Sequence, residues 1–219
     1  MRTVLSQTTD FSRFFRSWLA DPRRVASVAP SSDTLARLIT RGISPSDGAV
    51  LELGVGTGVF TRALLDLGIP EDALTLVECD DDFAATLRER FPRARVVQAN
   101  ATLLARREPF AADSFGAVVS GLPLLTMPPR RVMEILSGAF DRLRPAGSFY
   151  QFTYFPRCPV PRALLERLGL KAVCVGGTLW NLPPARVYRI SRRQPLAVTR
   201  RDSRVGTGRV RLHGFEAIG

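Results

Sequence analysis

From Ala49 onward, short apolar runs alternate along the chain with amphipathic segments. Five of the runs predict strands, at 50–54, 74–78, 95–98, 116–122 and 148–154. The segments between and after them predict helices, at about 58–67, 82–91, 130–144 and 160–169. This alternation is typical of a parallel sheet covered by helices on both faces. Two further runs, 171–177 and 185–190, predict a closing antiparallel pair, so we expect a seven-stranded, mostly parallel, doubly wound α/β sheet.

A different pattern precedes the first strand. Apolar side chains at helical spacing predict one amphipathic stripe, with Arg13 and Arg16 off it; the stripe consists of Phe11, Phe14, Phe15, Trp18 and Leu19. Most such stripes pack into a core. Because this one comes before the sheet and is rich in phenylalanine, we expect it to bind a membrane surface. We predict three parts: an arm at 1–32, the sheet domain at 33–193 and a basic, loosely ordered tail at 194–219.

Composition places the chain among globular proteins with a strong positive charge. It has 219 residues, 45% of them apolar, and a net charge of +11. Such a charge attracts a polyanion, either nucleic acid or the anionic face of a membrane. No run of about 18 apolar residues and no cleavable leader is present, so we expect a cytoplasmic protein without a membrane span.

Cysteine and histidine usage argues against two kinds of chemistry. Cys79, Cys158 and Cys174 lack the paired spacing of a zinc site, and we expect them to be buried in a reducing compartment. The only histidine, His213, lies six residues from the end of the chain. We therefore expect no metal and no histidine-based triad.

The segment "ELGVGTG" carries the clearest chemical signal. Its glycines allow a sharp turn out of the first strand and a close approach to a ligand. The spacing is G-x-G-x-G instead of G-x-G-x-x-G, and an acid precedes it. A carboxylate there would repel the pyrophosphate of NAD but suits a cationic ligand that bears an amino group, which favours S-adenosylmethionine. We predict cofactor contacts from the residues of this segment: Glu52, Gly54, Gly56, Thr57 and Gly58.

Acidic and polar residues after the next strands extend the predicted cofactor site. Glu78, with Cys79 beside it, ends the second strand, where a carboxylate can accept both hydrogens of a ribose diol. The alternative is that Glu78 only belongs to a helix cap, with Asp80 or Asp81 as the N-cap. Further predicted contacts are Asn100 and Ala101 for adenine, Ser120 after the fourth strand, and Ser32. The segment "APSS", residues 29–32, is expected to cap the next helix through Ser31 or Ser32, or to close over the methionine end of the donor.

Five segments together resemble the bacterial phospholipid N-methyltransferases. In chain order they are "FFRSWLADPRRVASVAPSS", "LELGVGTGVFTRALL", "VVSGLPLL", "QFTY" and "NLPPARVYRI". The resemblance covers roughly residues 11–190 and implies a Rossmann-like class I methyltransferase fold. It also implies successive N-methylation of phosphatidylethanolamine towards phosphatidylcholine, with S-adenosylmethionine as donor and S-adenosylhomocysteine as product. Ribosomal RNA adenine dimethyltransferases are similar to this family and are the main alternative.

The loop after the fourth strand favours the lipid. Enzymes that methylate an adenine amino group present an asparagine-led loop that ends in an aromatic residue. Here residues 120–124 read "SGLPL", without asparagine or ring, so we expect no nucleic-acid partner. A third possibility is a membrane-binding, methyltransferase-like protein without activity, which the intact glycines, Glu52 and Glu78 argue against.

A lipid headgroup sets demands that a few residues can meet. Tyr154, at the end of the fifth strand, is the predicted catalytic residue, orienting the amine by its hydroxyl or its ring; the alternative is packing under the arm. Arg186 is predicted to bind the headgroup phosphate, although pairing with an acid is nearly as plausible. Gly121, Leu122, Trp180 and Asn181 complete the predicted substrate site. We expect the enzyme to bind peripherally to the inner face of the cytoplasmic membrane.

Overall fold

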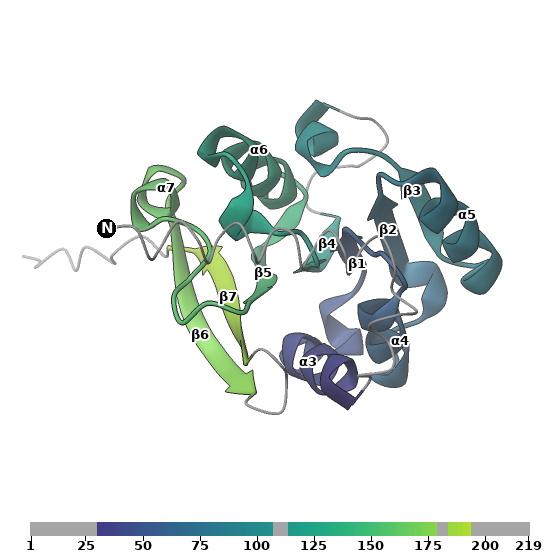
Figure 1. Cartoon of the computed structure of the whole chain (residues 1–219). Coiled ribbons are helices and arrows are strands. Elements are labelled where there is room, and N and C mark those ends of the chain that lie inside the picture. The colour runs from purple at the N-terminus through teal and green to yellow at the C-terminus, as the bar shows by residue number, and fades with distance from the viewer. Residues whose placement is uncertain (1–29, 107–113, 179–183, 194–219) are drawn as a thin grey trace, which may run out of the picture.

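The computed structural model describes residues 30–106, 114–178 and 184–193 (Figure 1). Their strands form one mixed sheet in the order β3-β2-β1-β4-β5-β7-β6. The strands are β1 (Val50–Leu53), β2 (Leu74–Glu78), β3 (Arg95–Gln98), β4 (Phe115–Ser120), β5 (Leu143–Thr153), β6 (Leu170–Thr178) and β7 (Ala185–Arg192). The predicted stripe at 11–19, the tail, Trp180 and Asn181 lie outside the described residues.

Strand pairing confirms the predicted doubly wound sheet. β1 pairs in parallel with both β2 and β4, and β4 pairs in parallel with β5. β7 runs antiparallel to β5, and β6 runs antiparallel to β7, which confirms the closing hairpin. β1 therefore lies at the point where the chain leaves in opposite directions along the sheet.

Helices cover both faces of this sheet (Figure 1). One face packs against α3 (Pro30–Thr40), α4 (Val59–Asp66) and α5 (Asp81–Arg90). The other face packs against the 3-10 helix η4 (Ala101–Arg106), α6 (Pro129–Phe140) and α7 (Arg162–Arg167). Three shorter 3-10 turns are η2 (Pro45–Asp47), η3 (Glu71–Ala73) and η5 (Leu124–Thr126). In the described part of the chain, no helix is both long and apolar enough to cross a bilayer.

Periodicity explains why these segments form their elements. In β1, Val50 belongs to the core on the α4 side, whereas Leu51 and Leu53 belong to the core on the α6 side. In α6, the buried residues recur at helical spacing and form the stripe that meets β4 and β5: Val132, Ile135, Leu136 and Ala139. The second residue of β1 on the α4 side is Glu52, an ionisable side chain in an apolar layer.

Two boundaries differ from the predicted ones. The helix predicted to reach about Arg144 ends at Phe140, and β5 begins at Leu143, earlier than predicted. The reason is distant in sequence: the Arg192 guanidinium of β7 donates to the carbonyl oxygens of Phe140 and Leu143 and lies over the Phe140 ring. Carbonyls left free at a helix end need such donors.

The start of α3 also differs from the predicted helix cap. α3 begins at Pro30, before Ser31 and Ser32, so neither serine occupies the predicted N-cap position. Proline is favoured in the first turn of a helix, where its missing N–H costs no hydrogen bond. The predicted boundary between arm and domain, at residue 32, therefore falls inside a helix.

We expect Gly116→Ala to destabilise the fold. The Gly116 amide donates to the Ala49 carbonyl, and a Cβ at this position would collide with the carbonyl oxygen of Asp47. Overpacking against backbone costs about 1–3 kcal/mol. Chemical unfolding should show this loss, whereas Glu89→Ala, on the exposed side of α5, should change the free energy of unfolding by less than about 0.5 kcal/mol. Equal stability of the two variants would contradict the packing at Gly116.

Candidate functional site

The loop after β1, residues 54–58, lies where the carboxyl ends of β1, β2 and β4 meet. Ligands of doubly wound sheets bind at such switch points. Gly54, Gly56 and Gly58 all have left-handed backbone, with φ of +67°, +55° and +76°. Other residues adopt this conformation at a cost, which explains why glycine recurs at all three positions.

The three glycines face different surroundings. A Cβ at Gly54 would lie 2.7 Å from Leu122 Cδ2, and one at Gly58 would lie 2.7 Å from Phe91 Cε2. A Cβ at Gly56 would meet no atom within 4 Å. Gly54 and Gly58 are therefore fixed by packing, while Gly56 borders open space in which a ligand can approach the backbone.

Glu78 links the end of β2 to this loop. Its Oε2 accepts a hydrogen bond from the Gly56 amide at 2.9 Å, and its Oε1 accepts from the amides of Cys79 and Asp80 at 2.8 and 3.1 Å. The N-cap of α5 is Asp80, whose side chain accepts from the amides of Asp82 and Phe83. The N-cap named in the alternative, Asp80, is therefore confirmed, but Glu78 also bonds to the Gly56 amide and so does more than belong to the cap. Its carboxylate is buried at the end of β2, and the ribose contact stays a prediction.

Glu52 is fully buried in β1 beneath the loop. Its Oε2 accepts from the Thr61 hydroxyl at 2.7 Å, while among the described residues its Oε1 has no hydrogen-bond partner. Burial is the largest cause of its raised pKa, about 8, and the Glu78 carboxylate raises the pKa further, against the Thr61 hydrogen bond. A buried oxygen without a donor suits a ligand that brings a cationic amino group.

The predicted adenine side is less clearly formed. Asn100 Oδ1 accepts from both the amide and the hydroxyl of Thr102, at 3.0 and 2.9 Å, so two donors already share the oxygen expected to face adenine. Ala101 is buried at the start of η4. The Cys79 residue as a whole is exposed. Desolvation of its thiol and the nearby Glu78 carboxylate both raise the pKa of that thiol. Ser32 lies in α3.

The loop after β4 closes against the glycine loop. Ser120 is buried and its Oγ accepts from the Leu122 amide at 3.3 Å. A Cβ at Gly121 would collide with the Gly54 carbonyl oxygen, so glycine alone permits this approach. Both loops therefore meet over the end of β1, with Leu122 between them.

Gln151 supports this loop and was given no role from the sequence. It is buried in β5, and its Nε2 donates to the carbonyl oxygens of Leu122 at 3.0 Å and Phe152 at 2.9 Å. The sequence feature that could have identified this role is the glutamine that opens "QFTY", a polar residue inside a strand expected to be buried. A buried amide among apolar neighbours indicates a structural task.

A cleft of about 620 Å³ lies beside the loop after β5 and the ends of β6 and β7. Tyr154 and Arg186, two predicted substrate residues, both line it. A chain of edge-to-face rings joins Tyr154 to Phe152 and Phe152 to Phe60 of α4, with centroids 5.4 and 5.7 Å apart. The cleft is thus connected through packed rings to the helix that follows the glycine loop.

The cysteine prediction is wrong. Cys79 and Cys174 are exposed and Cys158 is partly exposed. Cys174 lies on the edge strand β6, which the core covers only in part, and it lines the cleft.

Among the described residues no group of three acidic, cysteine or histidine side chains could hold a metal ion.

Comparisons with known proteins agree with this geometry. A family model described as a methyltransferase domain matches residues 50–147. An ornithine lipid N-methyltransferase of Singulisphaera acidiphila is 36% identical over 156 residues, which are 67% of this chain and 79% of the relative. The chain belongs to the class I S-adenosylmethionine-dependent methyltransferases, in the family that includes this bacterial lipid N-methyltransferase.

Two other similarities are narrower. The ribosomal RNA small subunit methyltransferase A of Bordetella pertussis is 36% identical over 118 residues, 52% of this chain but only 41% of the relative. Among solved structures, the Burkholderia thailandensis 1,6-didemethyltoxoflavin-N1-methyltransferase with bound S-adenosylhomocysteine has a TM-score of 0.57 at 19% identity, covering 87% of this chain and 92% of that one. This likeness confirms the Rossmann-like methyltransferase fold.

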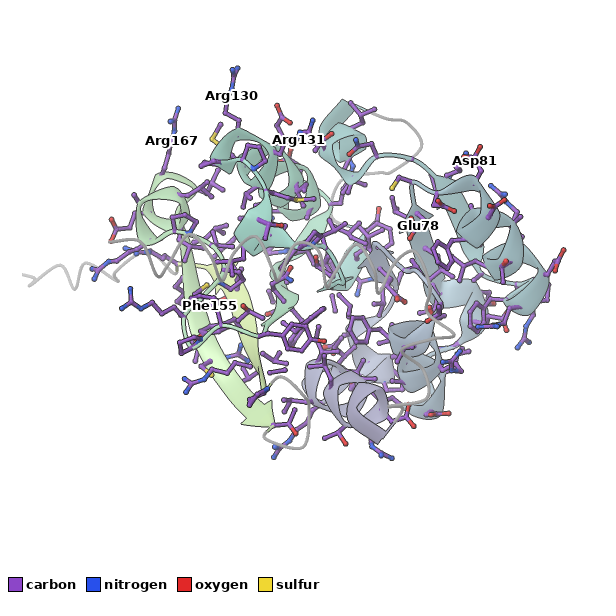
Figure 2. All side chains as sticks on the ribbon, in the orientation of Figure 1. Glu78, Asp81, Arg130, Arg131, Phe155 and Arg167 are labelled. Carbon is purple, nitrogen blue, oxygen red and sulfur yellow. The ribbon has the colours of Figure 1, made fainter. Side chains whose placement is uncertain are left out.

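The described residues fit S-adenosylmethionine, which supplies a methyl group from a positively charged sulfur. The carboxylate of Glu78 would hold its ribose. The Glu52 oxygen that has no hydrogen-bond partner among the described residues would hold its amino group. The open space at Gly56 would let the cofactor approach the backbone of the loop. Figure 2 shows Glu78 on the same side of the molecule as Asp81, at the start of α5. The contacts themselves stay predictions.

We expect the raised pKa of Glu52 to make stability fall with rising pH. The folded protein keeps this proton up to about pH 8, whereas the unfolded chain releases it near the ordinary value of 4.5. Between these values the folded state binds more protons, so the free energy of unfolding decreases as pH rises, by up to about 1.4 kcal/mol per pH unit.

Chemical unfolding of Glu52→Gln across this window should lack that component, because glutamine does not titrate. The free energy of unfolding of wild type minus that of the variant should therefore decrease steadily as the pH rises from about 4.5 to about 8. Glu89→Gln, exposed on α5, is the matched control and should follow the wild type. Parallel pH profiles for wild type and Glu52→Gln would contradict a buried, neutral Glu52.

Proposed function

We propose that the protein transfers methyl groups from S-adenosylmethionine to the amine of a membrane-lipid headgroup. The observation that carries this proposal is the cleft at the carboxyl end of β5, whose lining includes both an aromatic residue, Tyr154, and an arginine, Arg186. Phosphatidylethanolamine is the substrate that the sequence resemblance implies, and ornithine lipid is the one in the relative's name. Both headgroups combine an amine with an anionic group.

The cleft suits this pair of charges. Arg186 lies on its lining and supplies guanidinium N–H donors for a phosphate or carboxylate. The Tyr154 ring offers a π face to an ammonium and, after transfer, to its methylated products. Val175, Pro156 and Pro184 add apolar lining next to which acyl chains or methyl groups can lie. Binding the anion and the amine at separate points fixes the headgroup's orientation.

The amine must lose a proton before it can attack. A lysine-like amine has a pKa of about 10.4, so exposing its lone pair near pH 7 costs about 4–5 kcal/mol. Partial desolvation between Tyr154 and the apolar lining lowers this cost by disfavouring the charged form. The residues of the chain thus contribute by positioning the amine, excluding water and assisting deprotonation, without a covalent intermediate.

Methylation of ribosomal RNA adenine is supported less well. The ribosomal RNA small subunit methyltransferase A of Bordetella pertussis matches this chain over only 41% of its own length. Residues 120–124 contain no asparagine and no aromatic ring, the parts with which such loops hold a flipped base.

A lipid substrate would also place the protein peripherally on the inner face of the cytoplasmic membrane, with the stripe at 11–19 as its anchor.

The test offers radiolabelled S-adenosylmethionine to the full chain with three acceptors in parallel: vesicles containing phosphatidylethanolamine, vesicles containing ornithine lipid, and ribosomal RNA. We expect label in at least one lipid and none in the RNA. Label only in RNA, or in no acceptor, would overturn the proposal.

Two variants locate the headgroup site. Arg186→Gln should raise KM for the lipid about tenfold or more with a smaller change in kcat, because a charge-assisted hydrogen bond contributes about 1.5–3 kcal/mol. Tyr154→Leu should lower kcat/KM, whereas Tyr154→Phe keeps the ring and separates the ring's effect from that of the hydroxyl. Arg88→Gln, exposed on α5, is the control. Unchanged kinetics in both Arg186→Gln and Tyr154→Leu would place the headgroup elsewhere.

A further inference from the structure

Two of the three cysteines lie beside the cleft at the end of β5, and the function proposed above uses neither. Cys174 lies on β6, is exposed and lines the cleft. Cys158 lies in the segment that leads from β5 into α7, and it packs against the core on the α6 side of the sheet. We refer to Cys158 and Cys174 as the thiol pair.

The two thiols lie on the same side of the sheet. Leu170 belongs to the core on the α6 side, and Ala172 packs against that core. Because side chains alternate along a strand, Cys174, two positions further on in β6, points to this side as well. Cys158 packs against the same core, so the sheet does not separate the thiol pair.

Tyr188 of β7 is a neighbour of both thiols. It is the cross-strand partner of Cys174. Its hydroxyl donates to the Pro156 carbonyl at 3.3 Å, two positions before Cys158. Electrostatic effects agree with this arrangement: burial is the largest cause of the raised pKa of the Cys158 thiol, and Cys174 raises that pKa further. After burial, the same two sulfurs also raise the pKa of the Tyr188 hydroxyl. The three groups therefore form one cluster.

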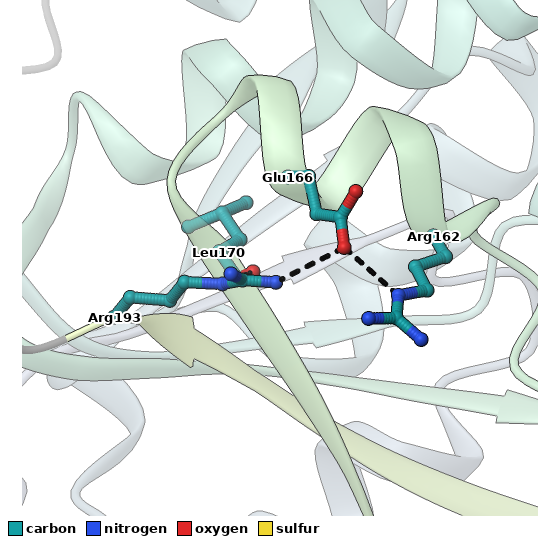
Figure 3. A network of polar contacts seen from close by, with 4 residues as sticks. All are labelled: Arg162, Glu166, Leu170 and Arg193. Atoms are coloured by element: carbon teal, nitrogen blue, oxygen red, sulfur yellow. Dashed lines mark hydrogen bonds and ion pairs between the residues drawn. The ribbon is translucent and has the colours of Figure 1, made fainter.

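A polar network holds the far end of the Cys158 segment next to β6. Glu166 Oε1 accepts from Arg162 Nε at 2.8 Å and lies 3.7 Å from Arg193 Nη2 (Figure 3). Arg193 also donates from Nε to the Leu170 carbonyl at 2.9 Å. Arg162 begins α7 shortly after Cys158, and Leu170 begins β6. The segment is thus tied to the hairpin on both sides of Cys158.

The backbone around the thiol pair is irregular. Residues 154–161 form neither helix nor strand. The pairing of β6 with β7 shifts between Cys174 and Gly176, which leaves Val175 as the extra residue of a β-bulge. Cys174 Sγ makes a weak hydrogen bond to the Gly176 carbonyl at 3.6 Å, across this bulge. A disulfide brings its sulfurs to about 2 Å, and backbone outside regular elements can move to allow this approach.

We propose that the thiol pair is an oxidation site, at which hydrogen peroxide joins Cys158 to Cys174 in a disulfide that closes the cleft to the methyl acceptor. One wall of the cleft is formed by residues 154–156, just before Cys158, and the other by residues 174–178 of β6. The bond would fasten these walls together. Closure of the cleft rests on the proposed function, because it assumes that the acceptor enters there, whereas formation of the disulfide does not.

The reaction needs peroxide as its oxidant. Cys174 reacts first because it is exposed, whereas burial keeps Cys158 protonated. The Cys174 sulfur attacks one peroxide oxygen: an S–O bond forms, the O–O bond breaks and water leaves. The Cys158 sulfur then attacks the resulting sulfenic acid: the S–S bond forms, the S–O bond breaks, and a second water leaves with the Cys158 proton. The two thiols are oxidised to one disulfide, the peroxide is reduced to water, and a dithiol reverses the change.

The first experiment maps the disulfide in the full chain. The protein is treated with hydrogen peroxide, cleaved with trypsin and measured by mass spectrometry without a reductant. Cleavage after Arg157, Arg162, Lys171 and Arg186 places the thiol pair in two peptides, 158–162 and 172–186. We expect these peptides joined, lighter by two hydrogen atoms than their sum, and separated by dithiothreitol. Sulfinic acid on Cys174 without the joined peptides, or a disulfide from either thiol to Cys79, would overturn the proposal.

The second experiment measures lipid methylation before and after peroxide, each variant being compared with its own untreated activity. Wild type should lose most of its activity and regain it with dithiothreitol. Cys158→Ser, which cannot form the disulfide, should keep its activity. Cys79→Ser is the matched control: Cys79 is also exposed, but it follows β2 near the other end of the sheet, so this variant should be inactivated like wild type.

A third measurement separates closure of the cleft from damage to the donor site. Stabilisation by S-adenosylhomocysteine should be the same for reduced and oxidised wild type, since the glycine loop is untouched. If the joined peptides form but the reduced protein methylates no lipid, the proposed function fails and the oxidation site stands. Equal loss of activity in wild type and Cys158→Ser, or full activity of the disulfide-bonded protein, would overturn the closure of the cleft.

Discussion

The carboxylate of Glu78 accepts three backbone amides from two separate segments, and the arrangement of the cofactor site depends on it. It holds Gly56, in the loop after β1, and the two residues that lead from β2 into α5. Hydrogen bonds to a charged acceptor are among the stronger ones in proteins. Because both segments are held from one carboxylate, the left-handed turns of the glycine loop and the start of α5 keep a fixed spacing without any ligand.

The second constraint is steric. Gly121 lies so close to the Gly54 carbonyl that no larger residue fits, and Gln151 holds the Leu122 carbonyl from β5. The loops after β1 and β4 are thereby packed against each other. The glycine loop, where we expect the donor, lies at the ends of β1, β2 and β4, and the cleft lies at the ends of β5, β6 and β7.

Much of this could be predicted from the sequence, because it depends on local patterns. The alternation of apolar runs predicted the strands and the antiparallel closing pair, and "ELGVGTG" predicted three glycines whose left-handed backbone the structure confirms. What could not be predicted depends on contacts between distant residues. Arg192 decides where α6 ends, Gln151 supports a loop 29 positions away, and the β6 bulge exposes Val175. The cysteine prediction was wrong because Cys174 lies on the edge strand β6, while Cys79 and Cys158 lie in the segments that follow β2 and β5, and composition reveals neither position.

The most direct test of the account is a crystal structure of the protein with S-adenosylhomocysteine. We expect the ribose hydroxyls on Glu78, the amino group directed at Glu52, and the sulfur facing the Tyr154 cleft past Leu122. A sulfur atom that faces away from that cleft, or is separated from it by the Phe152 ring, would contradict the claim that donor and lipid amine meet there.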